Sequence, residues 1–392
     1  MVNDAHNVLM VAAKANMIQQ FNLRNIELLQ QIGYTVHVAT DFIDFGSMDR
    51  DEDIKLIAYL HSHGVIMHQV DFGRGMGQFI ANLKSIGQLN HVVSDTKFDF
   101  MHVHSPIGAA LGRVVAIIRK IPVMYTAHGF HFFKGSPLKN WLVFPIEWIL
   151  SFSTKWLITI NHQDFALAKN ALHAEKVTYL PGVGVPVRDD FLISKDVRQA
   201  IRQQYRSEFN LDEDVLAIST IGELSGRKNQ QLVLRALAKV KDVVNFKYFI
   251  IGVGDKYAEL SNLADLLGIS EKVEFLGYRT DLRELHYMSD LNVFPSLREG
   301  LGLAGLEAIS DGDYLLGANN NGIRDYMLSS DFALGFNPKD VADLATKIVQ
   351  FYDDKKVPSI ERYKEKLLEF DSQNVDRIMD QNYREMEELV NE

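Results

Sequence analysis

The chain contains no cysteine, which excludes disulfide bonds, thiolate metal sites and a cysteine nucleophile. It also lacks an apolar run of the ~18 residues that a membrane-spanning helix needs. No basic stretch leads into an apolar segment at its start, so no signal peptide is expected. These absences fit a reducing compartment, and we expect a cytoplasmic protein.

Two motifs that would identify common enzyme classes are also missing. The loop after the first expected strand carries no G-x-G-x-x-G fingerprint, which argues against a nicotinamide dehydrogenase. No G-x-S-x-G elbow occurs, which argues against an α/β-hydrolase. The function must therefore be sought in other motifs.

Charge is distributed unevenly along the 392 residues. Residues 1–185 carry 15 Lys and Arg against 14 Asp and Glu, whereas residues 186–392 carry 26 against 37. The length exceeds what one core usually organises, so the asymmetry fits two domains in different surroundings. The acidic second half argues against nucleic acid as the main partner, because phosphate backbones need basic faces.

Short apolar runs alternate with helical patterns in both halves. A helix is expected at about 18–32, ended by Gly33, and the segment from about residue 359 onward looks wholly helical. The strands are expected at 8–13, 35–39, 101–103, 123–126, 157–160 and 177–180, and then at 216–221, 247–251, 273–276 and 291–294. Such alternation predicts parallel, doubly wound sheets.

The Pro/Gly cluster at 181–186 marks the domain boundary. We therefore predict an α/β protein with two doubly wound Rossmann-like domains that face each other across a cleft. An acceptor-side domain would cover 1–184 and a nucleotide-sugar-binding domain 185–370. A C-terminal helix at 371–392 is expected to pack back toward the first domain. The ligand would bind at the carboxyl ends of the strands.

The segment 298–308 holds the strongest group of candidate functional residues. Glu299 lies in a loop with Gly300 and Gly302, and Glu307 lies on the helix that this loop opens. A helix N-terminus suits a diphosphate, glycine permits close approach of a ligand, and a carboxylate can accept two hydroxyl hydrogen bonds. The pair alone is equally consistent with two surface glutamates that flank a loop.

The run FPSLREGLGL that starts at Phe294 closely resembles the donor-site signature of GT-B glycosyltransferases of family 4, whose core is a Glu-x7-Glu pair. Residues 125–141, 158–161 and 181–184 look like the bacterial exopolysaccharide, capsule and O-antigen branch of this family. The resemblance extends over essentially the whole chain.

The resemblance implies three catalytic residues. Glu299 would bind the hydroxyls of the donor hexose, Lys228 the donor diphosphate, and His128 would lie beside the transferred sugar. Lys228 and Glu299 are expected to be exposed in a cleft. Positive charge fixed in place at Lys228 and near the helix start at Gly302 would stabilise the leaving diphosphate.

The resemblance also implies a set of donor-binding residues. Glu307 would bind the ribose hydroxyls, and Tyr278 and Arg279 belong to a loop that lines the nucleotide base. The remaining donor-binding candidates are Arg227 and the loop residues Gly300, Leu301, Gly302 and Leu303.

Three departures from the family pattern stand out. Many relatives have an arginine where this chain has Glu223, so that phosphate contact is lost or passes to Arg227. The loop at 13–16 lacks the paired glycines common in the family. Asp313 follows Gly312 where relatives often have a Gly-x-Pro-Val turn, which we interpret as a structural variation.

The function implied by the resemblance is retaining transfer of a hexose or N-acetylhexosamine from a UDP-sugar to a saccharide acceptor. In this branch the acceptor is linked to polyprenyl diphosphate, and the product is a surface polysaccharide. No Asp-x-Asp stands at a strand end to bridge a metal ion and a diphosphate, so no metal and no cofactor are expected. The alternative is a non-catalytic partner subunit, which Glu223 supports and the retained Glu299, Glu307, Lys228 and His128 oppose.

Two further features have competing interpretations. His102 and His104 would lie on one strand face as a metal pair, but no third ligand is evident. All three tryptophans, with several phenylalanines and lysines, fall within 130–156. That mixture predicts a weak membrane contact at the inner face of the cell membrane, although helical spacing also fits a stripe that faces the core.

Overall fold

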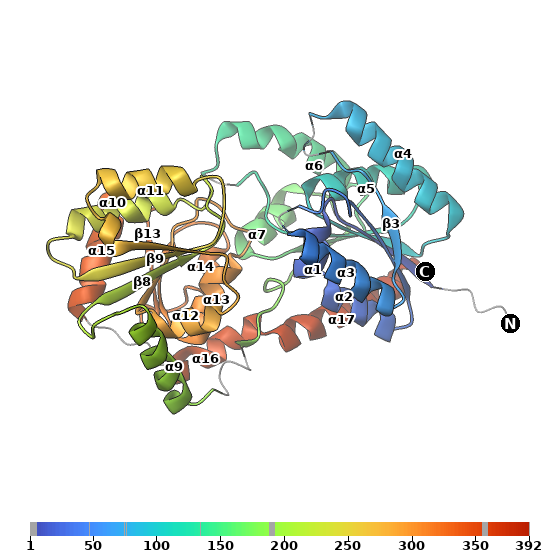
Figure 1. Ribbon diagram of the computed structural model, residues 1–392. Coiled ribbons are helices and arrows are strands. Elements are labelled where there is room, and N and C mark those ends of the chain that lie inside the picture. The colour runs from blue at the N-terminus through green and yellow to red at the C-terminus, as the bar shows by residue number, and fades with distance from the viewer. Residues whose placement is uncertain are drawn as a thin grey trace. The chain divides into compact units, whose positions relative to one another are not determined.

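The computed structural model describes residues 6–46, 48–73, 75, 77–133, 135–187, 193–354 and 360–391. The chain divides into two compact units, unit 1 of residues 1–183 and 373–392 and unit 2 of residues 184–372. Each unit contains one parallel sheet with helices on both faces (Figure 1). The predicted α/β architecture of two doubly wound domains is confirmed.

Unit 1 contains a seven-stranded sheet in the order β3-β2-β1-β4-β5-β6-β7. Its strands are β1 (Asn7–Val11), β2 (Thr35–Thr40), β3 (Ile66–Gln69), β4 (Phe100–His104), β5 (Val123–Ala127), β6 (Trp156–Thr159) and β7 (Lys176–Tyr179). Its helices are α1 (Ala15–Phe21), α2 (Leu23–Gln31), α3 (Arg50–Ser62), α4 (Phe79–Asp95), α5 (Pro106–Arg119), η1 (Leu138–Val143), α6 (Phe144–Ser151), α7 (His162–Ala171) and α17 (Ser372–Asn391).

Successive side chains of β1 enter opposite cores, which gives this unit two apolar layers. Val8 and Met10 pack with α1, α2, α3 and α17 on one face, while Leu9 and Val11 pack with α4, α5 and α7 on the other. Both faces of the strand are buried, as expected for a parallel sheet covered by helices on both sides.

Unit 2 contains a six-stranded sheet in the order β10-β9-β8-β11-β12-β13. Its strands are β8 (Leu216–Ile221), β9 (Phe246–Ile251), β10 (Val273–Gly277), β11 (Leu291–Phe294), β12 (Tyr314–Ala318) and β13 (Ala333–Phe336). Its helices are α9 (Lys195–Glu208), α10 (Gln230–Val240), α11 (Tyr257–Leu266), η2 (Ser270–Lys272), α12 (Leu282–Met288), α13 (Leu303–Asp311), α14 (Ile323–Tyr326), α15 (Val341–Asp354), α16 (Ile360–Leu367) and η3 (Leu368–Phe370).

Two expected helices are interrupted. The helix expected at 18–32 is divided into α1 and α2 at Asn22, a buried residue whose side chain donates to the carbonyl of Met17 at 3.0 Å. The C-terminal segment is interrupted at Asp371, where the backbone becomes extended and forms a bridge with Val185. The first interruption depends on a polar side chain and the second on a backbone pairing. Hydrophobic periodicity contains no information about either.

Candidate functional site

The candidate donor-side residues of unit 2 stand on loops that follow parallel strands. Arg227 and Lys228 lie between β8 and α10, and Glu299 lies between β11 and α13. β8 and β11 are neighbours in the sheet, so their carboxyl ends meet at one edge.

The side chains from these two loops meet in a compact ion cluster. The Glu299 carboxylate lies 2.8 Å from Lys228 Nζ and 2.9 Å from Arg227 Nη1. Burial alone would raise the pKa of Glu299, but the charges of Lys228 and Arg227 outweigh it and hold that pKa below its usual range. Glu299 is therefore ionised and already oriented at neutral pH.

Lys228 and Glu299 are less accessible than the sequence predicts. Their side chains are only 14% and 11% exposed. The Lys228 ammonium also lies 5.1 Å from the centre of the Phe294 ring. The expectation that both are exposed is thus wrong, because each partly covers the other and an aromatic ring packs against the lysine.

The loop from Gly300 to Leu303 is tightly packed where it opens α13. Gly302 has φ +87°, and a Cβ there would come within 2.6 Å of Phe294 Cε1. A Cβ on Gly322 would come within 2.0 Å of the Gly300 carbonyl oxygen. Glycine is therefore required at 302 to bring the chain to the start of α13, and at 322 because the segment before α14 passes close to this loop. N–H groups at the start of α13 suit an anion.

Glu307 lies one turn into α13 and is partly buried. Burial raises the pKa of its carboxyl, and the nearby Asp311 raises it further against the opposing charge of His286. His286 itself is buried and bonds Asp311 at 2.6 Å, an ion pair that the sequence analysis missed because its partners are 25 residues apart.

The base-side candidates stand after β10, two strands away from β8. The Arg279 guanidinium makes two bonds to Asp281, at 2.8 and 2.5 Å, and with Tyr205 lowers the pKa of Asp281 to about 2. Tyr278 is 65% exposed. Arg279 is thus held in a local ion pair, while most of the Tyr278 side chain is exposed to solvent.

Glu223 makes a loose ion pair with Arg227 at 3.8 Å, and its side chain is 60% exposed. Glu223 therefore lies beside the ion cluster and reduces its positive charge, but its exposed side chain does not cover the cluster. Asp313, the other departure from the family pattern, is buried at the start of β12, where burial raises its pKa well above the usual range.

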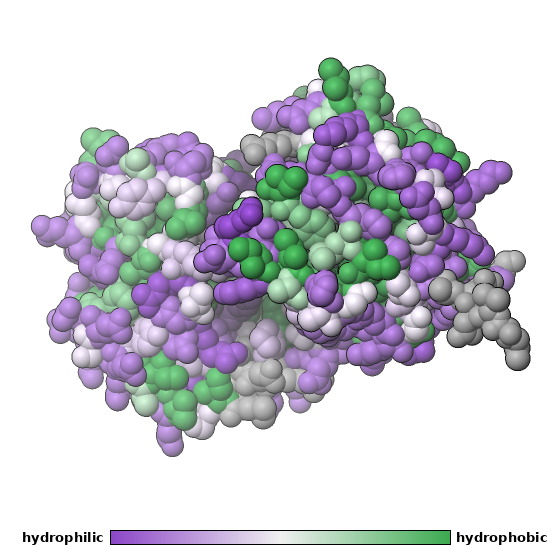
Figure 2. Space-filling view, turned by 45° about the vertical axis from the view of Figure 1, so that its right-hand side comes forward, coloured by the Kyte–Doolittle hydropathy of each residue, from purple (hydrophilic) through white to green (hydrophobic). Residues whose placement is uncertain are grey.

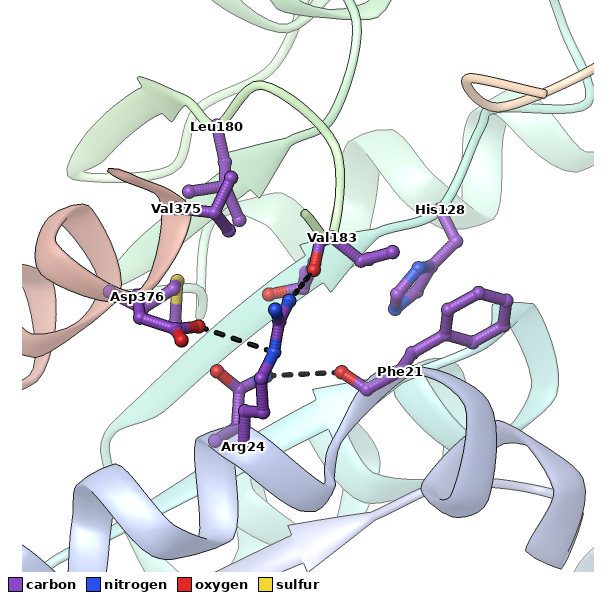
Figure 3. Close-up of a pocket in the computed structure, with 10 residues that line it drawn as sticks. Phe21, Arg24, His128, Leu180, Val183, Val375 and Asp376 are labelled. Carbon is purple, nitrogen blue, oxygen red and sulfur yellow. Dashed lines mark hydrogen bonds and ion pairs between the residues drawn. The ribbon is translucent and has the colours of Figure 1, made fainter. Parts of the chain in front are cut away.

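In unit 1, His128 follows β5 and lines a small pocket (Figure 3). Its ring lies 5.1 Å from that of Phe21, at the end of α1. Arg24 crosses this pocket, donating to the Val183 carbonyl and pairing with Asp376 at 3.3 Å. Burial lowers the pKa of His128 to about 4, so its ring is neutral at pH 7.

The glycine-poor loop after β1 places Lys14 between two carboxylates. Its Nζ lies 3.2 Å from Asp41 and 2.7 Å from Asp44. Lys14, which belongs to the loop that lacks the paired glycines of the family, is therefore held in place by two ion pairs.

The metal hypothesis for His102 and His104 gains no support. Among the described residues, no group of three or more His, Asp or Glu is arranged to hold a metal ion. His102 is instead bonded through both ring nitrogens, to the Tyr383 and Thr126 hydroxyls.

The aromatic segment 130–156 has both buried and exposed members. Phe130, Phe132 and Trp156 are buried, whereas Trp141, Trp148 and Phe152 are 37%, 39% and 61% exposed. Trp141, Trp148 and Phe152, which lie at helical spacing, therefore do not form a stripe buried in the core. The membrane contact of this segment stays a prediction. Lys134 lies outside the described residues.

Two family models match the chain. Residues 7–161 match the model described as glycosyl transferase 4-like, and residues 201–367 match the model for glycosyl transferases group 1. Each match falls within one of the two units.

Curated relatives and solved structures agree with these matches. The chain is 33% identical to the glycosyltransferase EpsD of Bacillus subtilis over 277 residues, which cover 69% of this chain and 72% of that protein. It is 27% identical over 289 residues to an Escherichia coli UDP-Gal:α-D-GlcNAc-diphosphoundecaprenol α-1,3-galactosyltransferase, over 70% of this chain and 72% of that one. The crystal structure of Anabaena Alr3699/HepE with UDP matches with a TM-score of 0.74 at 17% identity, covering 97% of this chain and all of that one.

Proposed function

Because this chain belongs to the GT-B glycosyltransferases of family 4, and is therefore a glycosyltransferase, we propose that it transfers a hexose or N-acetylhexosamine from a UDP-sugar with retention of configuration. The proposed acceptor is a saccharide on polyprenyl diphosphate, and the product a surface polysaccharide. The E. coli relative supports the donor and acceptor classes, since its name specifies a UDP-sugar and a diphosphoundecaprenol acceptor.

The observation that carries the proposal is the ion cluster of Glu299, Lys228 and Arg227 at the start of α13. When the sugar leaves, negative charge develops on the bridging oxygen of the diphosphate. A lysine held at 2.8 Å from Glu299 is already in place to stabilise that charge, and a preorganised donor of this kind contributes about 3 kcal/mol.

The same cluster supports the proposal of a retaining reaction without a covalent intermediate. Two cations hold the Glu299 carboxylate, which makes it a poor nucleophile and a good acceptor for sugar hydroxyls. We propose front-face attack, in which an oxygen of the departing phosphate takes the proton of the acceptor.

The purified chain should cleave one UDP-sugar slowly in water and transfer it faster to a polyprenyl-diphosphate-linked saccharide. Mass spectrometry with a panel of UDP- and GDP-sugars measures both reactions. Turnover of a GDP-sugar in preference to every UDP-sugar would contradict the proposed nucleotide. No turnover of any donor would contradict the proposed substrate class.

The proposed reaction needs no metal ion, since Lys228 and the start of α13 supply the charge at the diphosphate. Activity in excess EDTA should therefore equal activity in untreated buffer. Loss of activity in EDTA that Mn²⁺ or Mg²⁺ restores would overturn this part of the proposal, and excess EDTA saturated with Mg²⁺ is the control for the chelator itself.

We further propose that unit 1 makes a weak membrane contact through η1 and α6. Leu138, Leu142 and Ile149 are 88%, 77% and 60% exposed there. Glu147, the one acid of this segment, pairs with Arg113 at 2.8 Å, and Lys139 is exposed. Figure 2 shows hydrophobic side chains on the surface of this unit, and Phe79, the first residue of α4, is 71% exposed.

No helix of the described residues combines the length and apolarity that a membrane span requires. The proposed contact therefore rests on apolar burial at the headgroup level and on lysines worth about 1 kcal/mol each. It should be weak and salt-sensitive.

Leu138→Asp/Leu142→Asp should abolish co-sedimentation with anionic liposomes at low salt, and Lys139→Glu should weaken it. The matched control is Leu266→Asp, because Leu266 is 85% exposed but lies in unit 2. Equal binding by the double variant and the wild type, or a wild-type protein that stays in the supernatant, would contradict the membrane contact.

A further inference from the structure

A row of polar side chains crosses one face of the sheet in unit 1. His102 and His104 alternate on β4, Thr126 lies opposite His104 on β5, and Tyr383 reaches them from α17. The rings of His102 and His104 are 4.1 Å apart, and those of His104 and His128 are 5.4 Å apart. His102, His104 and Thr126 are almost fully buried.

His104 differs from His102 in how its ring nitrogens are satisfied. His102 bonds Tyr383 Oη at 2.9 Å and Thr126 Oγ1 at 2.8 Å, so both of its nitrogens have partners. His104 Nδ1 lies 3.2 Å from His128 Nε2, but His104 Nε2 is buried without a partner in the described part of the chain.

Burial lowers the pKa of His104 well below its usual range and that of His128 to about 4, so each ring carries one N–H at neutral pH. The contact between them then allows two arrangements. If His128 Nε2–H donates, His104 must carry its own proton on Nε2, where a buried N–H has no acceptor. If His104 Nδ1–H donates, its Nε2 is only an unused lone pair.

The second arrangement is favoured, because buried N–H groups without acceptors are rarer than unused acceptors. We propose that His104 is a positioning residue that donates from Nδ1 to His128 Nε2 and thereby fixes His128 as the Nδ1–H tautomer. His128 then presents an N–H donor from Nδ1 to an oxygen of its ligand, and it cannot act as a base through Nε2. That the ligand is a sugar rests on the proposed function.

The tautomer of His128 can be read directly by two-bond ¹H–¹⁵N correlation of histidine-labelled protein, with the His128→Gln variant to assign the signal. The wild type should show a protonated Nδ1 and an unprotonated Nε2. In His104→Leu the Nε2–H form should increase. His104→Asn, whose amide N–H can replace Nδ1–H, should keep the Nδ1–H form.

The control for loss of a histidine partner is His68→Leu. His37 on β2 and His68 on β3 form a comparable pair, with their ring nitrogens 2.9 Å apart. Among the described residues, neither of them contacts His128. This variant should leave the His128 signal unchanged. A wild-type His128 protonated on Nε2, or a tautomer unchanged in His104→Leu, would overturn the proposal. If His104→Leu does not fold, the wild-type and His104→Asn spectra still decide it.

Kinetics provide a second measurement once a donor is known. His104→Leu should lower kcat/KM roughly tenfold or more, while His104→Asn should stay within about threefold of the wild type, as expected for loss or retention of one hydrogen bond. Equal loss in both variants would contradict the positioning role. The tautomer measurement needs no substrate, so a failure of the proposed glycosyl transfer would leave it interpretable.

Discussion

Transfer activity should fall by about 10²–10³-fold in Lys228→Met, with little change in the affinity for acceptor. Lys228 is 2.8 Å from Glu299 and fixed beside Phe294, so its charge needs no rearrangement when the diphosphate leaves. Methionine keeps most of the apolar stem and removes only the charge. Glu299→Gln should lower activity by a similar factor, because it removes a charged acceptor for sugar hydroxyls and loosens Lys228.

The measurement is steady-state transfer with thermal unfolding of each variant alongside. Removing one charge leaves Glu299 with Arg227 as its partner, so the loss of unfolding free energy should stay below about 3 kcal/mol. Lys239→Met is the control, since Lys239 is exposed near the end of α10, the helix that follows the Lys228 loop. Near wild-type turnover in folded Lys228→Met would contradict the donor-site assignment.

The general architecture could be predicted from the sequence because parallel strands are short, apolar and separated by helical patterns. The prediction missed β3, β12 and β13. The cause is clearest for β3, whose residues IMHQ are half polar and whose ends, Ile66 and Gln69, are exposed at the edge of the sheet. An edge strand with two polar residues has no apolar run to identify it. It became visible only through its pairing with β2.

The sequence singles out the candidate donor-side residues one by one, but it does not predict their mutual geometry. Lys228 and Glu299 are 71 residues apart, and only the adjacency of β8 and β11 brings them to 2.8 Å. The same applies to His104, which spacing alone suggested as a metal ligand. Its partner, His128, directly follows the neighbouring strand β5. A sequence period describes contacts along one strand rather than between two.

Glu307→Gln should weaken the binding of UDP by about 10- to 150-fold at pH 7.5, the equivalent of one or two hydrogen bonds to a charged group. The reason is that ribose hydroxyls would donate to the ionised carboxylate, and an amide offers one acceptor atom without charge. Glu259→Gln is the control, because Glu259 is an exposed glutamate at the start of α11 in the same unit.

The pH dependence of that binding gives an independent test of the same carboxylate. Burial raises the pKa of Glu307, so its carboxylate takes up a proton at a higher pH than an ordinary glutamate does. Ribose binding needs the ionised form, and UDP affinity should therefore fall as the pH is lowered through that raised value. Calorimetry should measure the UDP affinity of the wild type and of Glu307→Gln at each pH. The titration of UDP itself affects both proteins equally, so it cancels in the ratio of their affinities. This ratio should shrink toward one as the pH falls, and a ratio constant with pH, or a Glu307→Gln variant that binds UDP as the wild type does, would show that Glu307 does not hold the ribose.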